Sequence, residues 1–142
     1  MRTILFRGQK SDTKEMIYGD LIQLEKDFKK VVEILDWSKV DNKKKSKSDL
    51  TVIPETVGQF SGLTDKNGTK IFEGDIIAHF DLENKKQIIF KNGAFGYMTA
   101  DGYDFISYSE NRHNFDFRDN KSDFIEVVGN IHENPELLNT SF

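Results

Sequence analysis

The sequence predicts a mainly β fold: a small SH3-like or related partly open barrel with an N-terminal hairpin and at most one short helix. Two Asn-Gly pairs, at 67–68 and 92–93, indicate hairpin turns, because both residues readily adopt positive φ. From Leu50 onward, short apolar segments alternate with glycine-rich and polar turns. This pattern favours a barrel or sandwich over a parallel α/β sheet.

The first 21 residues are expected to form the N-terminal hairpin. Residues 3–7 alternate weakly and end at Arg7-Gly8, residues 9–14 are polar, and residues 15–21 resume an extended pattern. Polar residues between two alternating segments are typical of a hairpin loop.

Residues 21–37 admit two interpretations. Apolar residues recur at helical spacing, with charged residues between them, which slightly favours a short helix. The run 31–35 (Val-Val-Glu-Ile-Leu) is β-branched and would equally suit a strand. The apolar residues at helical spacing are Leu21, Leu24, Phe28, Val31 and Leu35.

Residues 41–49 contain no apolar side chain and four lysines. We interpret them as a solvated loop, since short lysine runs without aromatic residues are usually solvent-exposed. The alternative is a small basic contact for nucleic acid or for an acidic partner.

The remainder of the chain is expected to form the barrel core. We expect one domain over residues 1–142, in which 1–50 hold the hairpin and a variable helix or loop element and 51–142 hold the core. A closing strand over 124–131 would end at Asn134-Pro135, because proline cannot donate to the strand ladder. The other expected strands are 50–53, 57–60, 70–72, 75–80, 87–90, 94–98 and 103–108.

Composition excludes several classes of protein. The chain of 142 residues has 20 basic and 24 acidic residues, a net charge of −4, which argues against a dedicated nucleic-acid binder. It contains no cysteine, so disulfides, cysteine nucleophiles and cysteine metal sites are excluded. The first apolar group, at residues 4–6, is too short for a signal peptide or a membrane span. We therefore expect a soluble protein of the bacterial cytoplasm without membrane contact.

Three blocks of the sequence resemble the YopX family of phage and prophage proteins. They are residues 2–19, residues 53–77 and residues 126–138. The second block contains Pro-Glu-Thr-Val-Gly-Gln-Phe-Ser-Gly-Leu-Thr-Asp-Lys-Asn-Gly, and the third contains Val-Val-Gly-Asn-Ile-His-Glu-Asn-Pro-Glu-Leu-Leu. The resemblance implies a small mainly β domain of phage or prophage origin. It implies no activity, since no biochemical function is established for the family.

The residues themselves assemble no convincing catalytic or metal site. His79, His113 and His132 are far apart in the sequence and share no ligand spacing. Asp75 and Asp81, six positions apart, would lie about 20 Å apart along a straight strand, too far to share a cation. We predict no catalytic residue, no cofactor and no bound metal. A metal-dependent nuclease built on these acids is the weakest alternative.

Aromatic residues between 90 and 108 offer a nucleic-acid alternative. Exposed on one face of a barrel, they would stack on single-stranded bases; packed inside, they would form the core. The positions of Tyr97, Tyr103 and Tyr108 distinguish these interpretations. The full set is Phe90, Phe95, Tyr97, Tyr103, Phe105 and Tyr108.

The favoured function is a non-enzymatic accessory protein that binds a protein, either a host or phage factor or a second copy of itself. Residues 109–122 are expected to be an exposed, mobile loop, and variable loops on a rigid scaffold often carry binding. The candidate partner-binding residues in this loop are Arg112, His113, Asp116 and Arg118.

Overall fold

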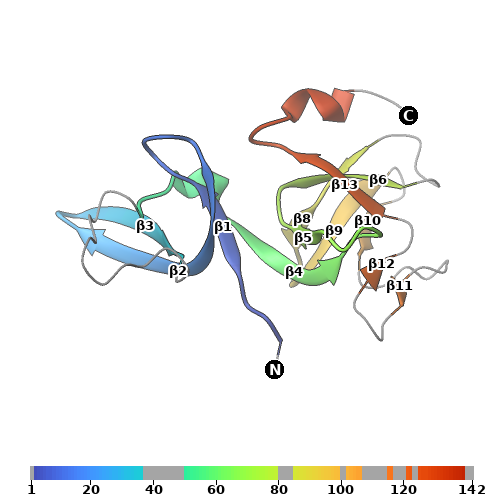
Figure 1. Cartoon of the computed structure of the whole chain (residues 1–142), viewed down its shortest axis with the longest axis horizontal. Helices are drawn as coiled ribbons and strands as arrows, with labels where there is room; N and C mark the ends of the chain where they lie inside the picture. Colours follow the sequence, from blue (N-terminus) through green and yellow to red (C-terminus); the bar gives the residue numbers. More distant parts are fainter. Residues whose placement is uncertain are drawn as a thin grey trace. The chain divides into compact units, whose positions relative to one another are not determined.

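The computed structural model confirms the mainly β class (Figure 1). It describes residues 2–36, 50–79, 85–99, 102–106, 115–116, 121–122 and 125–139. Across these ranges the strands form sheets that are almost entirely antiparallel and do not close into a barrel. The helical structure in the same ranges is two 3₁₀ turns, η3 (Pro54–Thr56) and η4 (Pro135–Asn139). The lysine-rich segment 41–49, expected to be a solvated loop, lies outside the described residues.

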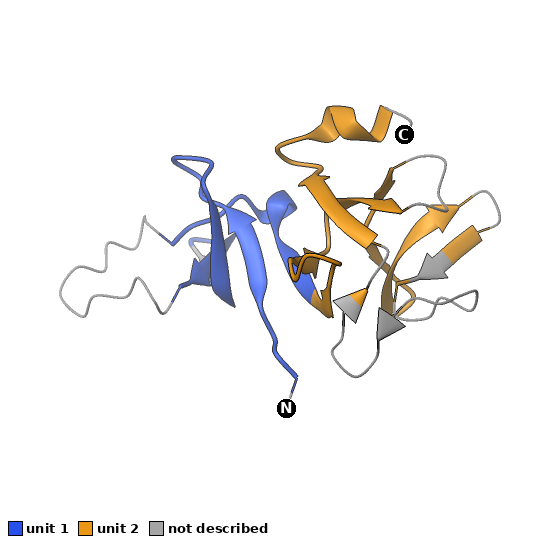
Figure 2. Ribbon diagram, turned by 45° about the vertical axis from the view of Figure 1, so that its right-hand side comes forward, with its two compact units in different colours: residues 1–60 blue, residues 61–142 orange. Residues whose placement is uncertain are grey.

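The chain divides into two compact units, coloured separately in Figure 2. Unit 1 comprises residues 1–60 and unit 2 residues 61–142. The boundary falls inside strand β4 (Gly58–Thr64), which contributes residues to both units. The organisation of the chain as one domain, with a core from residue 51, stays a prediction.

Unit 1 is a sheet in the order β4-β1-β2-β3, which includes the expected N-terminal hairpin. Strand β1 (Phe6–Gln9) pairs with the first part of β2 (Met16–Lys26), and the second part of β2 pairs with β3 (Lys29–Leu35). Residues 50–52 add to β3, since the N–H of Ile34 donates to Leu50 O and that of Val52 to Val32 O.

The prediction of a helix within residues 21–37 was wrong. Residues 21–26 continue β2 and residues 29–35 form β3, so this part of the chain is a long hairpin. Its apolar residues match helical spacing by coincidence, because a two-residue turn at Asp27-Phe28 interrupts the alternation. The β-branched run of β3 determined the outcome, since it pairs along seven register positions with β2.

A small apolar core holds unit 1 together. Ile17, Ile34 and Val52 are buried at its centre. The buried Thr56 ties the η3 turn to β1: its hydroxyl accepts a hydrogen bond from Gln9 N (2.9 Å) and donates one to Ile53 O (2.6 Å). Thr56, near the start of the second sequence block, therefore anchors a turn.

Unit 2 contains two three-stranded sheets, one in the order β10-β9-β8 and one in the order β13-β6-β7, together with the end of β4 and its partner β5. These strands are β5 (Lys70–Phe72), β6 (Asp75–His79), β7 (Lys86–Gln87), β8 (Ile89–Lys91), β9 (Ala94–Thr99), β10 (Gly102–Phe105) and β13 (Ile125–Asn130). The core of the unit is Leu63, Ile71, Ile77, Ile88, Ile106 and Ile125.

The two Asn-Gly pairs form hairpin turns of different types. Asn92 and Gly93 both have positive φ (52° and 80°), as expected for a type I′ turn between β8 and β9. Between β4 and β5, only Gly68 has positive φ (81°), so the expectation for Asn67 was wrong. There the N–H of Gly68 donates to Asp65 O, which makes Gly68 the left-handed last residue of a turn from 65 to 68.

The described residues of segment 109–122 form two short strands. Within it, β11 (Phe115–Asp116) pairs with β12 (Lys121–Ser122), and Lys121 pairs in parallel with Thr64 of β4. Ser122 is fully buried, and its hydroxyl accepts a hydrogen bond from Ile125 N. The expectation of an exposed segment was therefore wrong for Ser122.

Candidate functional site

The acidic residues of the second sequence block hold turns. Asp65 is 1% exposed, and its carboxylate accepts three backbone N–H groups, from Asn67, Thr69 and Val127, each at 2.9 Å. Asp75 is equally buried and accepts the N–H of Phe72 at 2.7 Å. Both carboxylates thus have a structural use.

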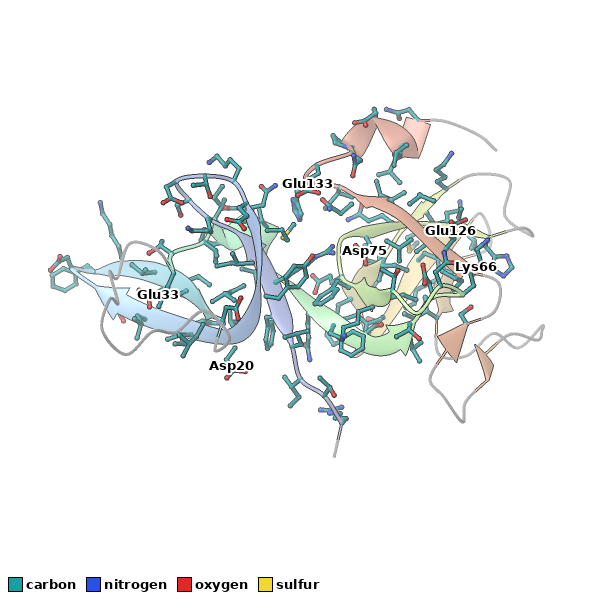
Figure 3. The ribbon with its side chains drawn as sticks, in the orientation of Figure 1. Asp20, Glu33, Lys66, Asp75, Glu126 and Glu133 are labelled. Carbon is teal, nitrogen blue, oxygen red and sulfur yellow. The ribbon has the colours of Figure 1, made fainter. Side chains whose placement is uncertain are left out.

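The third block closes unit 2 in the same manner. The side-chain oxygen of Asn130 accepts the N–H groups of His132 and Glu133, and its amide donates to the Glu133 carboxylate at 3.1 Å. On β13, Glu126 forms an exposed ion pair of 3.3 Å with Lys66, and both are labelled in Figure 3. The described residues of this block stabilise a turn and a strand.

The residues considered for the metal-dependent alternative form no cluster in the described part of the chain. There, no group of three or more histidine, aspartate and glutamate side chains could hold a metal ion. His79 lies on β6 and His132 in the turn after β13, while Asp81 and His113 lie outside the described residues.

The aromatic residues of the β10-β9-β8 sheet lie on both of its faces. Phe95 and Tyr97 pack against the core of unit 2. Tyr103 is in register with Met98, on the opposite face of β9 from Tyr97, because successive residues of a strand alternate between faces. Its hydroxyl donates its one proton to Ala94 O (2.6 Å), with Ile89 O at 3.2 Å, so the ring lies along this sheet. Tyr97 and Tyr103 therefore share no stacking platform; Tyr108 lies outside the described residues.

The phenol of Tyr103 predicts a loss of stability at high pH. Burial raises its pKa above the ordinary value of 10.0, because desolvation disfavours the phenolate. The folded chain therefore keeps its proton where the unfolded chain loses it. The stability that the neutral phenol contributes is complete below pH 10.0 and falls as the pH rises through the folded pKa.

We expect Tyr103→Phe to lower the free energy of unfolding at neutral pH by about 1 kcal/mol, since the hydrogen bond from the phenol to Ala94 O is lost. We also expect a shallower fall in stability at high pH than in the wild type. Urea denaturation at a series of pH values on both sides of the ordinary pKa of 10.0 measures both effects. If the free energy of unfolding falls equally with pH in the wild type and in Tyr103→Phe, Tyr103 does not titrate as described.

The most exposed large apolar side chain among the described residues is Phe28, at the turn of the β2–β3 hairpin. It is 99% exposed, whereas Leu24 on the adjoining strand is 38% exposed. Residues 23–25 and 27–30 are all exposed, so this end of the hairpin extends beyond the core of unit 1 (Figure 1). The ring of Phe28 contributes nothing to that core.

The backbone at Phe28 is also unfavourable for a phenylalanine. Asp27 and Phe28 have φ of 49° and 63°, the left-handed conformation of a type I′ turn. Glycine or asparagine is preferred there, and a bulky side chain costs roughly 1 kcal/mol. Strained residues of this kind cluster at functional sites.

Charged residues flank Phe28 along the hairpin. Asp27, Lys29 and Lys30 are exposed, and Lys30 is in register with Glu25. Both signs of charge are thus represented, with lysine following the phenylalanine in the chain. An exposed aromatic ring with polar neighbours matches the composition of protein–protein interfaces, which are enriched in aromatic residues and have polar rims.

Phe28 was not among the predicted site residues, because the slightly favoured helical interpretation put it on the apolar side of a helix. The signal that identifies it is the two-residue gap in the pairing of 20–26 with 29–35. The candidates of segment 109–122 stay predictions: Arg112, His113 and Arg118 lie outside the described residues, and the side chain of Asp116 is not described.

The fold and the site define a small protein of open antiparallel sheets, with an exposed aromatic hairpin turn. The chain belongs to the YopX family, whose model, described as YopX protein, matches residues 5–139.

Two solved structures are similar to this chain over almost its whole length. Protein EF1440 from Enterococcus faecalis is 24% identical with a TM-score of 0.53, over 97% of this chain and 99% of that one. Protein yopX from Bacillus subtilis is 17% identical with a TM-score of 0.51, over the same shares. At these identities the likeness shows the fold. A comparison with curated proteins found no match.

In the described residues, no helix has the length and apolar character that crossing a membrane requires.

Proposed function

We propose that this YopX-family chain is a phage- or prophage-encoded accessory protein of the bacterial cytoplasm that works by binding another protein and catalyses no reaction. The observation that carries the proposal is the fully exposed Phe28 on a strained hairpin turn. A ring in that position costs solvation and backbone energy in the isolated chain. Burial in an apolar pocket of a partner would recover the solvation energy.

The described polar side chains of the sequence blocks support a non-enzymatic role. Asp65, Asp75 and Asn130 use carboxylate or amide atoms to hold backbone N–H groups. A catalytic carboxylate has to face substrate, and these face turns of their own chain. Unit 1, in contrast, exposes the ring of Phe28 to solvent.

Phe28→Gly tests the proposal without harming the fold. Glycine suits the left-handed turn, so we expect the melting temperature to stay level or to rise by a few degrees, while capture of the partner is lost. Affinity capture from bacterial cells, followed by identification of what is retained, gives the readout. Phe90→Gly is the control, since Phe90 is a half-exposed phenylalanine in unit 2 and should keep the partner.

Capture that is identical for the wild type and Phe28→Gly would contradict the proposal. Capture by Phe28→Gly that is lost in the double variant Arg112→Ala, Arg118→Ala would place the interface in segment 109–122 instead.

The second candidate function is single-stranded nucleic-acid binding at the same turn. An exposed ring next to Lys29 and Lys30 could stack on a base while the lysines meet phosphates. The net charge of −4 disfavours it. Binding of a fluorescent oligonucleotide that weakens steeply with salt and is absent in Phe28→Gly would favour this candidate over a protein partner.

A further inference from the structure

Strand β2 has an edge that no strand of the described chain pairs with. On the β1 side, pairing runs from Met16 to Gly19 and ends there, because β1 begins at Phe6. On the β3 side, pairing continues from Asp20 to Lys26. The second half of β2 is therefore hydrogen-bonded along one edge only, and such an edge is a template for another strand.

The hydrogen bonds between β3 and residues 50–52 show which backbone groups of β2 face that edge. Val32 and Ile34 bond to residues 50–52, away from β2, so Val31 and Glu33 direct their backbone groups toward β2. Their register partners are Leu24 and Ile22. The alternate residues of β2 consequently direct their N–H and C=O groups toward the unpaired edge. These alternate residues are Leu21, Gln23 and Glu25.

We propose that this edge pairs antiparallel with the same edge of a second copy of the chain, about a two-fold axis at Gln23. The pairing exchanges hydrogen bonds between Gln23 and Gln23 of the copy, and between Leu21 and Glu25 of the copy. It joins the two hairpins into one four-stranded sheet, β3-β2-β2-β3, with the same patch used on both chains.

The residues on the edge are self-complementary in this register. Ile22 is opposite Leu24 of the copy twice, in the closely spaced pairs where side chains contact best. Leu24 is 38% exposed in the single chain, so the pairing covers apolar surface. Asp20 is in register with Lys26 of the copy, also twice, which matches opposite charges. On the face of β2 that carries Asp20, Ile22, Leu24 and Lys26, the paired residues thus suit one another.

The proposed pairing of β2 with β2 of the copy does not involve Phe28. The ring lies in the turn, outside the paired residues, and remains available to a partner in the dimer. Phe28→Gly should therefore leave self-association unchanged, which separates this proposal from the proposed function.

Two charge reversals test the register. Asp20→Lys alone places lysine opposite lysine, and Lys26→Asp alone places aspartate opposite aspartate. We expect each variant to dimerise about tenfold or more weakly than the wild type. An equimolar mixture of the two variants should recover wild-type affinity, because each lysine of one variant is then opposite an aspartate of the other in both halves of the interface.

Sedimentation velocity of the full chain over a concentration series measures these affinities. Amide exchange gives an independent readout: protection at Leu21, Gln23 and Glu25 should increase with concentration, while Ile22 and Leu24 stay protected throughout by β3. The mixture also controls for folding, because each variant can only associate if it is folded.

A wild-type chain that stays monomeric up to about 1 mM overturns the proposal. So does a mixture that associates no better than either variant alone. Dimerisation that is unaffected by both variants would place the contact elsewhere and overturn it equally.

Discussion

Gly19→Ala should be the most damaging single-methyl change in unit 1. A Cβ at position 19 would overlap Leu35 O and lie 2.5 Å from Leu35 C, and both are backbone atoms that cannot move without breaking the β2–β3 pairing. Gly19 stands where β2 passes from β1 to β3. We expect a loss of about 3 to 5 kcal/mol in the free energy of unfolding, measured by urea denaturation followed by far-UV circular dichroism.

Gly8→Ala is the matched control. Its Cβ would meet Ile34 Cδ1 at 3.1 Å and Val52 Cβ at 3.2 Å, which are side-chain atoms with some freedom to shift. The loss should be about 1 to 2 kcal/mol, as is usual for slight overpacking. Equal stabilities for the two variants would mean that the close approach of residues 19 and 35 is absent in the protein.

Asp65→Ala should have the largest effect in unit 2. The change leaves the N–H groups of Asn67, Thr69 and Val127 without the carboxylate that now accepts them. These bonds join the β4–β5 turn to β13, at a site that is 1% exposed. Hydrogen bonds to a charged group contribute about 1.5 to 3 kcal/mol each, and water can replace some of them. We expect a loss of at least about 3 kcal/mol in the free energy of unfolding.

Glu126→Ala provides the comparison, on β13 next to Val127. It removes only the exposed ion pair with Lys66, so the loss should be below about 1 kcal/mol. Denaturation together with amide exchange of Val127 and Asn67 distinguishes the two variants. Retained protection of both amides in Asp65→Ala would contradict the assigned hydrogen bonds.

Local turn chemistry is the part of the fold that the sequence predicts best. Asn92-Gly93 adopts the expected type I′ turn, because this pair tolerates positive φ at both residues. Asn67-Gly68 gives the expected hairpin with a different turn, since the Asp65 carboxylate holds the N–H of Asn67 and of Thr69. That carboxylate also bonds to residue 127, a contact that no local pattern contains.

Residues 21–37 show why the candidate site could not be predicted. A type I′ turn is normally indicated by asparagine or glycine, and this one is Asp27-Phe28. Without that signal, the apolar spacing matched a helix and placed the ring of Phe28 in a core. A phenylalanine at positive φ conflicts with the usual preference for glycine or asparagine. Such conflicts between residue type and backbone conformation occur most often at functional sites, so this one identifies the turn as a functional feature.

Gly19 shows a second reason why the sequence alone does not predict the whole fold. The sequence shows a glycine between two alternating segments, which indicates an interruption of the strand. The reason for it is the approach of the backbone at residue 35, which is a tertiary contact. Such contacts follow from the pairing of whole strands, so they become visible only once the topology is known.

Site-specific photo-cross-linking tests most directly whether the turn at Phe28 contacts a partner protein. The full-length chain carries a photoreactive phenylalanine analogue at position 28 and, as the control, at position 92 in the exposed turn of unit 2. After irradiation in bacterial cells, the account predicts a discrete protein adduct from position 28 and none from position 92. No adduct from position 28, the same adduct from both positions, or an adduct with nucleic acid alone would contradict it.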